Sequence, residues 1–314
     1  MIVVFTGGTG GSKLVHGLQE VVAGNELTVV VNTGDDVEWW GLHVSPDIDS
    51  VLYELSGQLD FERGWGVENE TFRCRQRMKR FGQPSWFSLG DLDLATHLTR
   101  TILLREGKSL SEATAELAAK LGVQARVLPM SDDRVSTMLE TARGTLTFQE
   151  YFVRERYQVD VQAVRFEGAE DAQPAPGVLG AIESADAIIF APSNPVTSLG
   201  PILAVPGIRA VLRRSSTPIA AVSPIVGGAA VSGPTGALMQ VMGWPTSLAG
   251  IAKAYEDFLN VLIADVSDED EAQHLNGDRL HVVCTNTLMR SLADKRDLAR
   301  FTLDSLATLL SPKA

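Results

Sequence analysis

The chain has 314 residues, 45% of them hydrophobic and 21% charged, which is enough for a sizeable core in one large or two modest domains. Its net charge of −12 at pH 7 argues against nucleic acid or an anionic membrane surface as the main partner. Only two cysteines are present, no apolar run is long enough to span a membrane and no secretory signal is seen, so we expect a cytoplasmic protein without disulfides.

The first predicted element is a strand at Ile2–Thr6, a short apolar run that suits burial on both faces. A glycine turn follows, and then a helix with apolar residues at helical spacing and Ser12 as its expected cap. Backbone N–H groups at such a helix start attract anions. The run matches neither the Walker motif nor G-x-G-x-x-G, because Ser12 and Lys13 stand where those motifs need glycine. The glycine run favours a phosphate or nucleotide site over a tight structural turn, but it does not indicate which cofactor binds.

A second buried strand is predicted at Leu27–Val31, and it ends in the polar run 32–36, where open α/β sheets place ligands. Pro46–Leu55 reads as a helix, with an early proline and acids in its first turn. Residues 57–122 are predicted to form a helical insertion. Its expected helices are Thr71–Phe81, Asp91–Arg105 and Ser109–Leu121, the last with a capping box formed by Ser109 and Glu112.

The second half of the chain returns to strands and then repeats β and α units. A strand at Gln124–Leu128 precedes a β-hairpin over Val135–Val153, and Gly168–Pro176 is a polar connection. The later elements are expected to be helix Pro176–Ser184, strand Ala187–Ala191, helix near Pro206–Arg213, strand Pro218–Val222, helix near Ser247–Val261, strand Leu280–Cys284 and a helical tail. This alternation predicts a single α/β domain over residues 1–314 with a doubly wound, mostly parallel, Rossmann-like sheet.

Aspartates in loops and at helix starts are the conspicuous candidates for chemistry: Asp35, Asp36, Asp47, Asp49, Asp91, Asp93, Asp132 and Asp133. Asp47 and Asp49 stand two residues apart, so one can cap a helix while the other points at a ligand. Such carboxylates suit Mg²⁺, which is usually held by one or two of them plus substrate phosphate. We predict Asp36 and Asp49 as catalytic and metal-binding residues, whereas Asp91 and Asp132 serve equally well as helix caps.

Two later loops follow predicted strands and offer hydroxyls, amides and free backbone. One contains Ser193 and Asn194, and the other contains Ser223. Both come at the carboxyl ends of strands, so we expect them to contact a ligand. Ordinary proline-rich turns are the alternative, because the same residue types dominate turns.

Two histidines and three tryptophans lie in or near these polar motifs. His43 and His97 could touch a ligand, although a structural role is the simpler interpretation. Trp39, Trp40 and Trp65 could stack on a flat ring, or they could fill the core or a subunit interface.

Together these motifs resemble the 2-phospho-lactate transferase family of deazaflavin coenzyme biosynthesis, and the resemblance runs nearly end to end. The motifs that carry it are Phe5-Thr6-Gly7-Gly8-Thr9-Gly10, Val31-Asn32-Thr33-Gly34-Asp35-Asp36, Ser45-Pro46-Asp47-Ile48-Asp49-Ser50-Val51-Leu52-Tyr53, Trp65-Gly66-Val67-Glu68-Asn69, Leu89-Gly90-Asp91-Leu92-Asp93-Leu94-Ala95-Thr96-His97, Leu128-Pro129-Met130-Ser131-Asp132-Asp133, Pro192-Ser193-Asn194-Pro195 and Val222-Ser223-Pro224-Ile225-Val226-Gly227-Gly228. Each motif is weak alone, but the set is highly specific.

The resemblance implies an Mg²⁺-dependent enzyme that uses a guanosine diphosphate derivative of 2-phospholactate or, in bacterial members, of phosphoenolpyruvate. The phospho-organic acid passes to the terminal ribityl hydroxyl of 7,8-didemethyl-8-hydroxy-5-deazariboflavin, and GMP is released, in the synthesis of coenzyme F(420). We expect a homodimer. Family members commonly carry Arg or Lys at the position of Leu92, where only the backbone could make such a contact here. The expected substrate contacts are Gly7, Gly8, Thr9, Gly10, Asn32, Asp49, Asp91, Leu92, His97, Ser193, Asn194 and Ser223.

Two other functions compete with this one. The related gluconeogenesis factor proteins also open with a glycine turn, and they suggest a regulator that binds a nucleotide-sugar without catalysis. The stretch 90–97 and the Trp65-Gly66 loop favour the transferase instead. A nicotinamide oxidoreductase is disfavoured, because the glycine run fails the G-x-G-x-x-G pattern.

Overall fold

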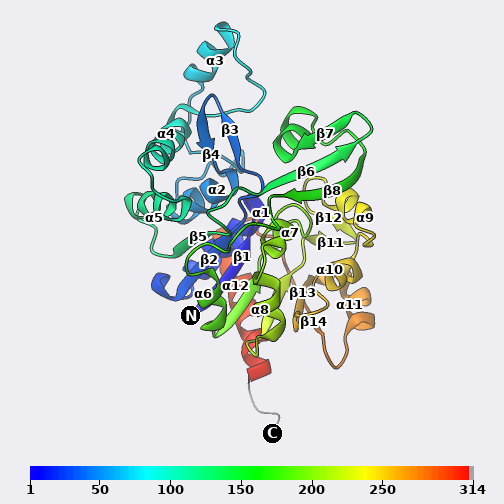
Figure 1. Cartoon of the computed structure of the whole chain (residues 1–314). Coiled ribbons are helices and arrows are strands. Elements are labelled where there is room, and N and C mark those ends of the chain that lie inside the picture. The colour runs from blue at the N-terminus through cyan, green and yellow to red at the C-terminus, as the bar shows by residue number, and fades with distance from the viewer. Residues whose placement is uncertain (311–314) are drawn as a thin grey trace.

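The computed structural model describes residues 1–310, and a seven-stranded parallel sheet lies at its centre (Figure 1). The strand order is β14-β13-β10-β9-β1-β2-β5. The strands are β1 Ile2–Thr6, β2 Leu27–Val31, β5 Arg126–Pro129, β9 Ala187–Phe190, β10 Ile219–Val222, β13 Val261–Asp265 and β14 His281–Thr285. The predicted doubly wound, Rossmann-like sheet is confirmed.

Helices cover both faces of this sheet, because successive side chains of a strand point to opposite sides. In β1, Val3 and Phe5 belong to one hydrophobic core and Val4 belongs to the other. The core that contains Val4 is covered by α1 Thr9–Gln19, α2 Pro46–Leu55, α5 Leu110–Lys120 and α12 Leu292–Leu310. The opposite core is covered by α6 Val178–Glu183, α8 Ile208–Arg214 and α10 Leu248–Ala254.

The connections from β1 and β9 leave the sheet in opposite directions. From β1 the chain continues to β2 and β5 on one side, and from β9 it continues to β10, β13 and β14 on the other. The carboxyl ends of β1 and β9 therefore flank a topological switch point, the place where open α/β sheets bind ligands. The glycine turn follows β1 and the loop with Ser193 follows β9, so both predicted ligand loops meet there.

Three helices lie between α2 and β5 in the chain: α3 Arg73–Arg80, α4 Asp91–Arg105 and α5. The bounds of α2 and α4 agree with the predicted helices. The predicted capping box is also confirmed, because the Ser109 hydroxyl accepts from the Glu112 N–H while the Glu112 carboxylate accepts from the Ser109 N–H. Beside α4 lies a small hairpin of β3 Val37–Trp39 and β4 Leu42–Val44, and α3 extends outward from it (Figure 1).

The predicted hairpin at 135–153 is confirmed as β6 Ser136–Thr141 and β7 Gly144–Thr147, but it belongs to a three-stranded sheet. The third strand, β8 Val161–Glu167, pairs with β6 and was not predicted. All residues of β8 are at least partly exposed, so its sequence lacks a clear buried face. Within the predicted hairpin segment, Glu150–Arg154 forms a turn of π-helix, a geometry frequent at functional sites.

Two predicted boundaries are wrong. The helix near Ser247–Val261 ends at Ala254, and Val261 instead begins β13, a fully buried strand between β10 and β14. Short apolar runs do not distinguish a buried strand from a buried helix by periodicity. Ser12 does not cap α1: the N-cap is Gly8, and the Ser12 hydroxyl donates to the carbonyl of Thr9 within the first turn.

Three short helices were not predicted: α7 Leu199–Ala204, α9 Thr235–Val241 and α11 Glu269–Leu275. Within residues 1–310, no helix is both long and apolar enough to cross a membrane.

Candidate functional site

The larger of two adjoining cavities, with a volume of about 620 Å³, opens at the carboxyl ends of the central strands. The glycine turn and the start of α1 form one wall. The loop after β9 contributes Ser193 and Asn194, and the loop after β10 contributes Ser223. The structure thus brings together most of the predicted nucleotide-binding residues, including Gly8, Thr9 and Gly10.

The glycines of this turn are needed for close approach. The turn contains Gly7, Gly8, Gly10 and Gly11. None of these has a positive φ, so a left-handed backbone conformation does not explain why they are glycines. A Cβ on Gly8 would lie 2.5 Å from Asp47 Oδ1, and a Cβ on Gly10 would lie 2.9 Å from the carbonyl oxygen of Pro192. Gly7 donates its N–H to the Ser193 hydroxyl at 3.1 Å, which joins the turn to the β9 loop. The bare backbone leaves room for a ligand at the start of α1.

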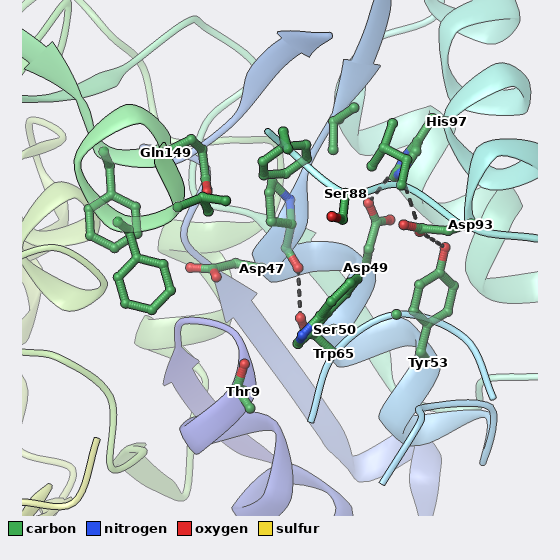
Figure 2. A pocket seen from close by; sticks show the side chains of 18 residues that line it. Thr9, Asp47, Asp49, Ser50, Tyr53, Trp65, Ser88, Asp93, His97 and Gln149 are labelled. Atoms are coloured by element: carbon green, nitrogen blue, oxygen red, sulfur yellow. Dashed lines mark hydrogen bonds and ion pairs between the residues drawn. The ribbon is translucent and has the colours of Figure 1, made fainter. Parts of the chain in front are cut away.

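The smaller cavity has a volume of about 380 Å³ and lies beside the larger one, between α2, α4 and the π-helical turn (Figure 2). Its walls are rich in aromatic rings, which suit a flat ligand. Trp65 lines it, whereas Trp39 is packed into a hydrophobic core. At its inner end lie polar groups from two helices: Asp49 and Tyr53 of α2, and Asp93 and His97 of α4.

The two cavities share five lining residues: Thr9, Asp47, Trp65, Phe148 and Phe152. Thr9 lies at the start of α1 and Asp47 in the first turn of α2. The three aromatic side chains come from the insertion and from the segment after β7. A ligand in one cavity would therefore face a ligand in the other across Thr9 and Asp47. Both residues are labelled in the close-up of the smaller cavity (Figure 2).

Three carboxylates gather at this junction without enough positive charge to balance them: Asp35 is buried, and Asp36 and Asp47 are partly buried. Burial raises the pKa of Asp47 to about 7, with the charge of Asp36 adding to the effect and a hydrogen bond from Asn32 opposing it. Burial and the charge of Asp47 likewise raise the pKa of Asp35 well above its ordinary value. Burial also raises the pKa of Asp36, although His43 and Ser45 donate to its Oδ2 and oppose that effect.

Asp49 is part of a different buried group. Arg100 is fully buried on α4 and donates from both terminal nitrogens to the two oxygens of Asp49. His97 lies between them and Asp93, with Nε2 3.2 Å from Asp93 Oδ1. Burial opposes ionisation of Asp93, but interactions with His97 and a hydrogen bond from Tyr53 outweigh it and lower the pKa of Asp93. This network fixes Asp49 and His97 at the edge of the smaller cavity.

Several predicted site residues lie outside both cavities. Asp91 accepts from the backbone N–H groups of Arg73 and Cys74, so it caps α3. Leu92 is 51% exposed and lines neither cavity. Asn32 is fully buried and holds Asp47 through a 2.9 Å hydrogen bond.

The remaining predicted residues take mixed positions. Gly7 lies behind the cavity wall, and Asp132 accepts from the N–H of Ser111 in the first turn of α5. Asp36, predicted as a metal ligand, lines neither cavity, and its Oδ2 is occupied by His43 and Ser45.

A magnesium ion fits Asp35 and Asp47 better than the predicted pair. Both line the larger cavity, and Asp35 Oδ1 is buried with no hydrogen-bond partner among residues 1–310. The raised pKa values of both groups mark a place that lacks positive charge. Over the same residues, no three acidic, histidine or cysteine side chains form a metal site on their own, so substrate phosphates would have to supply further ligands.

Comparison with known proteins decides the family. The family model described as "2-phospho-L-lactate transferase CofD" matches residues 2–293. The chain belongs to the CofD family. Its CofD relatives include the 2-phospho-L-lactate transferase of Methanococcoides burtonii, which is 44% identical over 95% of this chain and 97% of its own length. They also include the phosphoenolpyruvate transferase of Streptomyces griseus, 40% identical over 96% of this chain and 97% of its own.

The solved structures extend the fold beyond the CofD family. A protein of the UPF0052 family from Bacillus halodurans aligns with a TM-score of 0.63 over 96% of this chain and 98% of its own, at 18% identity. At that identity the likeness shows the fold alone. The CofD match and the named relatives support a CofD-type transferase role for this chain.

Sequence reasoning underestimated parts of this site. Asp35 and Asp47 were recognised as candidates but not selected. Arg100 was missed, although Asp93, His97 and Arg100 follow helical spacing and so share one face of α4. Phe148 and Phe152 left no usable signal, because their place on the cavity wall depends on the unpredicted π-helical turn.

Proposed function

We propose that this CofD-type enzyme transfers a phospho-organic acid from its guanosine diphosphate derivative to the terminal ribityl hydroxyl of deazariboflavin, in the synthesis of coenzyme F(420). The acid is 2-phospholactate or phosphoenolpyruvate. One observation carries the proposal: two cavities of different character meet at Thr9 and Asp47. The larger one, with the glycine turn, suits a guanylated donor, and the smaller aromatic one suits the flat deazaflavin ring.

In this proposal the reaction takes place at the junction. The ribityl hydroxyl oxygen attacks the phosphorus of the transferred acid and releases its proton to solvent. The bond between that phosphorus and the bridging oxygen of the diphosphate breaks, and GMP leaves with this oxygen. Phosphoryl transfer needs in-line positioning and neutralised charge more than covalent help. The first turn of α1 holds the donor phosphates, and Asp49, fixed by Arg100, orients the hydroxyl from the acceptor cavity.

Magnesium is part of the proposal, with Asp35 and Asp47 as its protein ligands. When bound there, Mg²⁺ would neutralise charge on the donor diphosphate and on the leaving phosphate. The two carboxylates would hold the ion together with the donor phosphates, since Mg²⁺ is commonly bound by one or two carboxylates plus substrate phosphate.

The test is to incubate the protein with deazariboflavin and each guanylated acid in turn, and to follow the product by mass spectrometry. We expect product and GMP in equal amounts with one or both donors, and no GMP when the acceptor is left out. Product formation should stop with excess EDTA and return with Mg²⁺. Binding of nucleotide without any product from either donor would favour the nucleotide-sugar-binding regulator instead.

A further inference from the structure

A loop of the insertion, residues 60–67, lies against the junction of the two cavities. A Cβ on Gly64 would be 3.5 Å from Thr9 Cγ2, so the tip of the loop lies close to the start of α1. Gly64 and Gly66 have φ of +72° and +71°, and they set Trp65 between them so that it lines both cavities. Arg63, next to the tip, lines the larger cavity.

The guanidinium of Arg63 is held rigidly in this loop. Its Nη2 donates to the Val67 carbonyl at 2.8 Å and pairs with Asp60 Oδ2 at 2.9 Å. Its central carbon lies 5.5 Å from the ring centroids of both Trp65 and Phe72. Stacking and hydrogen bonds of this kind fix the plane of the fork before any ligand arrives.

The donors of this fixed group are not all used. Arg63 Nε is buried and has no hydrogen-bond partner in the described part of the chain, although the side chain as a whole is 29% exposed. A buried donor without a partner costs free energy, so such groups in native proteins are usually completed by water or a ligand. The cavity that Arg63 lines is where that ligand would come from.

The charges around the larger cavity indicate which ligand group needs Arg63. Asp35 and Asp47 line the same cavity, so an anion entering it meets repulsion unless a cation is near. Three cationic side chains line it: Lys13 on α1, the exposed Arg290, and Arg63. Of these, Arg63 belongs to the loop whose tip lies close to Thr9, where the two cavities meet.

We propose that Arg63 binds the carboxylate of the transferred acid, an inference that rests on the proposed function. Both candidate acids carry a carboxylate next to the phosphate, and the GMP part of the donor carries none. The planar fork of arginine matches a carboxylate better than the point charge of lysine does. Arg63 therefore positions the acid at the junction and discriminates a full donor from a plain guanosine nucleotide.

The experiment compares two ligands that differ at the carboxylate. The dissociation constants of GDP and of each guanylated acid are measured by calorimetry for the wild-type protein and for Arg63→Gln, Arg63→Lys and Arg290→Gln. We expect Arg63→Gln to weaken binding of the guanylated acid by about ten- to a hundredfold, the range for a charged hydrogen bond. Binding of GDP should weaken by less than about threefold. Arg63→Lys should fall between, and Arg290→Gln should change both ligands by the same factor.

Equal losses for GDP and the guanylated acid in Arg63→Gln would overturn the proposal, because they would indicate a phosphate contact or a loosened loop. Unchanged affinity for both ligands would overturn it as well. A lowered melting temperature would reveal a folding defect in Arg63→Gln. In that case the affinities of Arg63→Lys for GDP and for the guanylated acid decide the question. Failure of the proposed function looks different: the wild-type protein would form no product with either donor, whatever the Arg63 variants bind.

Discussion

At the scale of single residues, the site depends on backbone that comes very close to its neighbours. Gly10 faces the Pro192 carbonyl and Gly8 faces Asp47. A Cβ added at either glycine would lie closer to these neighbours than Cβ atoms in real proteins do. Because Pro192 presents backbone, it cannot move aside as a flexible side chain would. The glycine turn after β1 and the loop after β9 are thus fitted to one another, and the opening between them is set by the absence of side chains.

The first prediction is that Gly10→Val disrupts the turn. We expect a loss of about 1–3 kcal/mol in unfolding free energy from overpacking, together with at least tenfold weaker GDP binding. The matched control is Gly180→Val in α6, where a Cβ would meet nothing within 4 Å. Urea unfolding and calorimetry measure both variants. GDP affinity that survives in a folded Gly10→Val protein would show that the turn does not contact the nucleotide.

The second prediction separates the carboxylates by role. Asp47→Asn should reduce turnover by about a hundredfold or more, the scale of a lost catalytic charge, and should raise the Mg²⁺ concentration needed for half activity. Asp49→Asn should also lower turnover, because Asp49 orients the ribityl hydroxyl, but it should leave the Mg²⁺ requirement unchanged. It should in addition lower stability by about 3 kcal/mol, because it leaves Arg100 as a buried, unpaired charge. Activation by Mg²⁺ and melting temperature are measured on both variants. If Asp47→Asn keeps its turnover, the metal-binding carboxylates lie elsewhere, and Asp36 is next.

At the scale of elements, the strands and helices that have a clear local sequence pattern were predicted correctly. Strands β1, β2, β9 and β10 were predicted because they are continuous apolar runs bounded by turn residues. The strand β13 was merged into a helix, because its residues continue the apolar composition of the segment before it. The cavities themselves were beyond prediction, since they depend on how the insertion and the π-helical turn pack over the sheet.

The positions of the ligand loops of the site were predicted correctly, but the choice of the aspartates that line the larger cavity was not. The loops with Thr9, Ser193 and Ser223 were placed correctly at strand ends, since that position follows from topology. Which aspartate faces the larger cavity depends on shifts of one or two residues at the starts of loops and helices. Asp35 and Asp47 face the larger cavity, and their neighbours Asp36 and Asp49 are engaged by His43 and Arg100.

The third prediction concerns α3, whose start depends on a residue outside it. Asp91 accepts from two N–H groups of the first turn of α3, and none of the residues of α3 is buried. Asp91→Ala should therefore loosen α3 at a cost of about 1 kcal/mol and leave the KM for deazariboflavin within about twofold. Hydrogen exchange of residues 73–80 and steady-state kinetics are the measurements. A large rise in KM with protected α3 amides would make Asp91 a substrate contact, as the sequence motif suggested.

At the scale of the whole molecule, a buried ionic group ties the C-terminal helix to the N-terminal half. Lys295 of α12 and His16 of α1 both contact Glu54 Oε1 on α2, and both Lys295 and Glu54 are almost fully buried. Burial alone would raise the pKa of Glu54, but His16 and Lys295 outweigh it and hold the pKa below its ordinary value of 4.5. The three helices all cover the same face of the sheet.

The last prediction follows from the sign of that shift. Because the pKa of Glu54 is lower in the folded protein than in the unfolded chain, the group stabilises the fold above about pH 4.5 and loses that effect as the pH falls through the folded value. Glu54→Gln should lower the unfolding free energy by about 3 kcal/mol at pH 7, since it leaves Lys295 unpaired in the interior, and the cost should shrink toward pH 3.

The matched control is Glu20→Gln, which breaks the more exposed pair of Glu20 with Arg296 between the same α1 and α12. It should cost less than about 1 kcal/mol. Urea unfolding of both variants at pH 7, 5, 4 and 3 measures the difference, and equal costs at pH 7 would show that burial adds nothing to the attachment of α12.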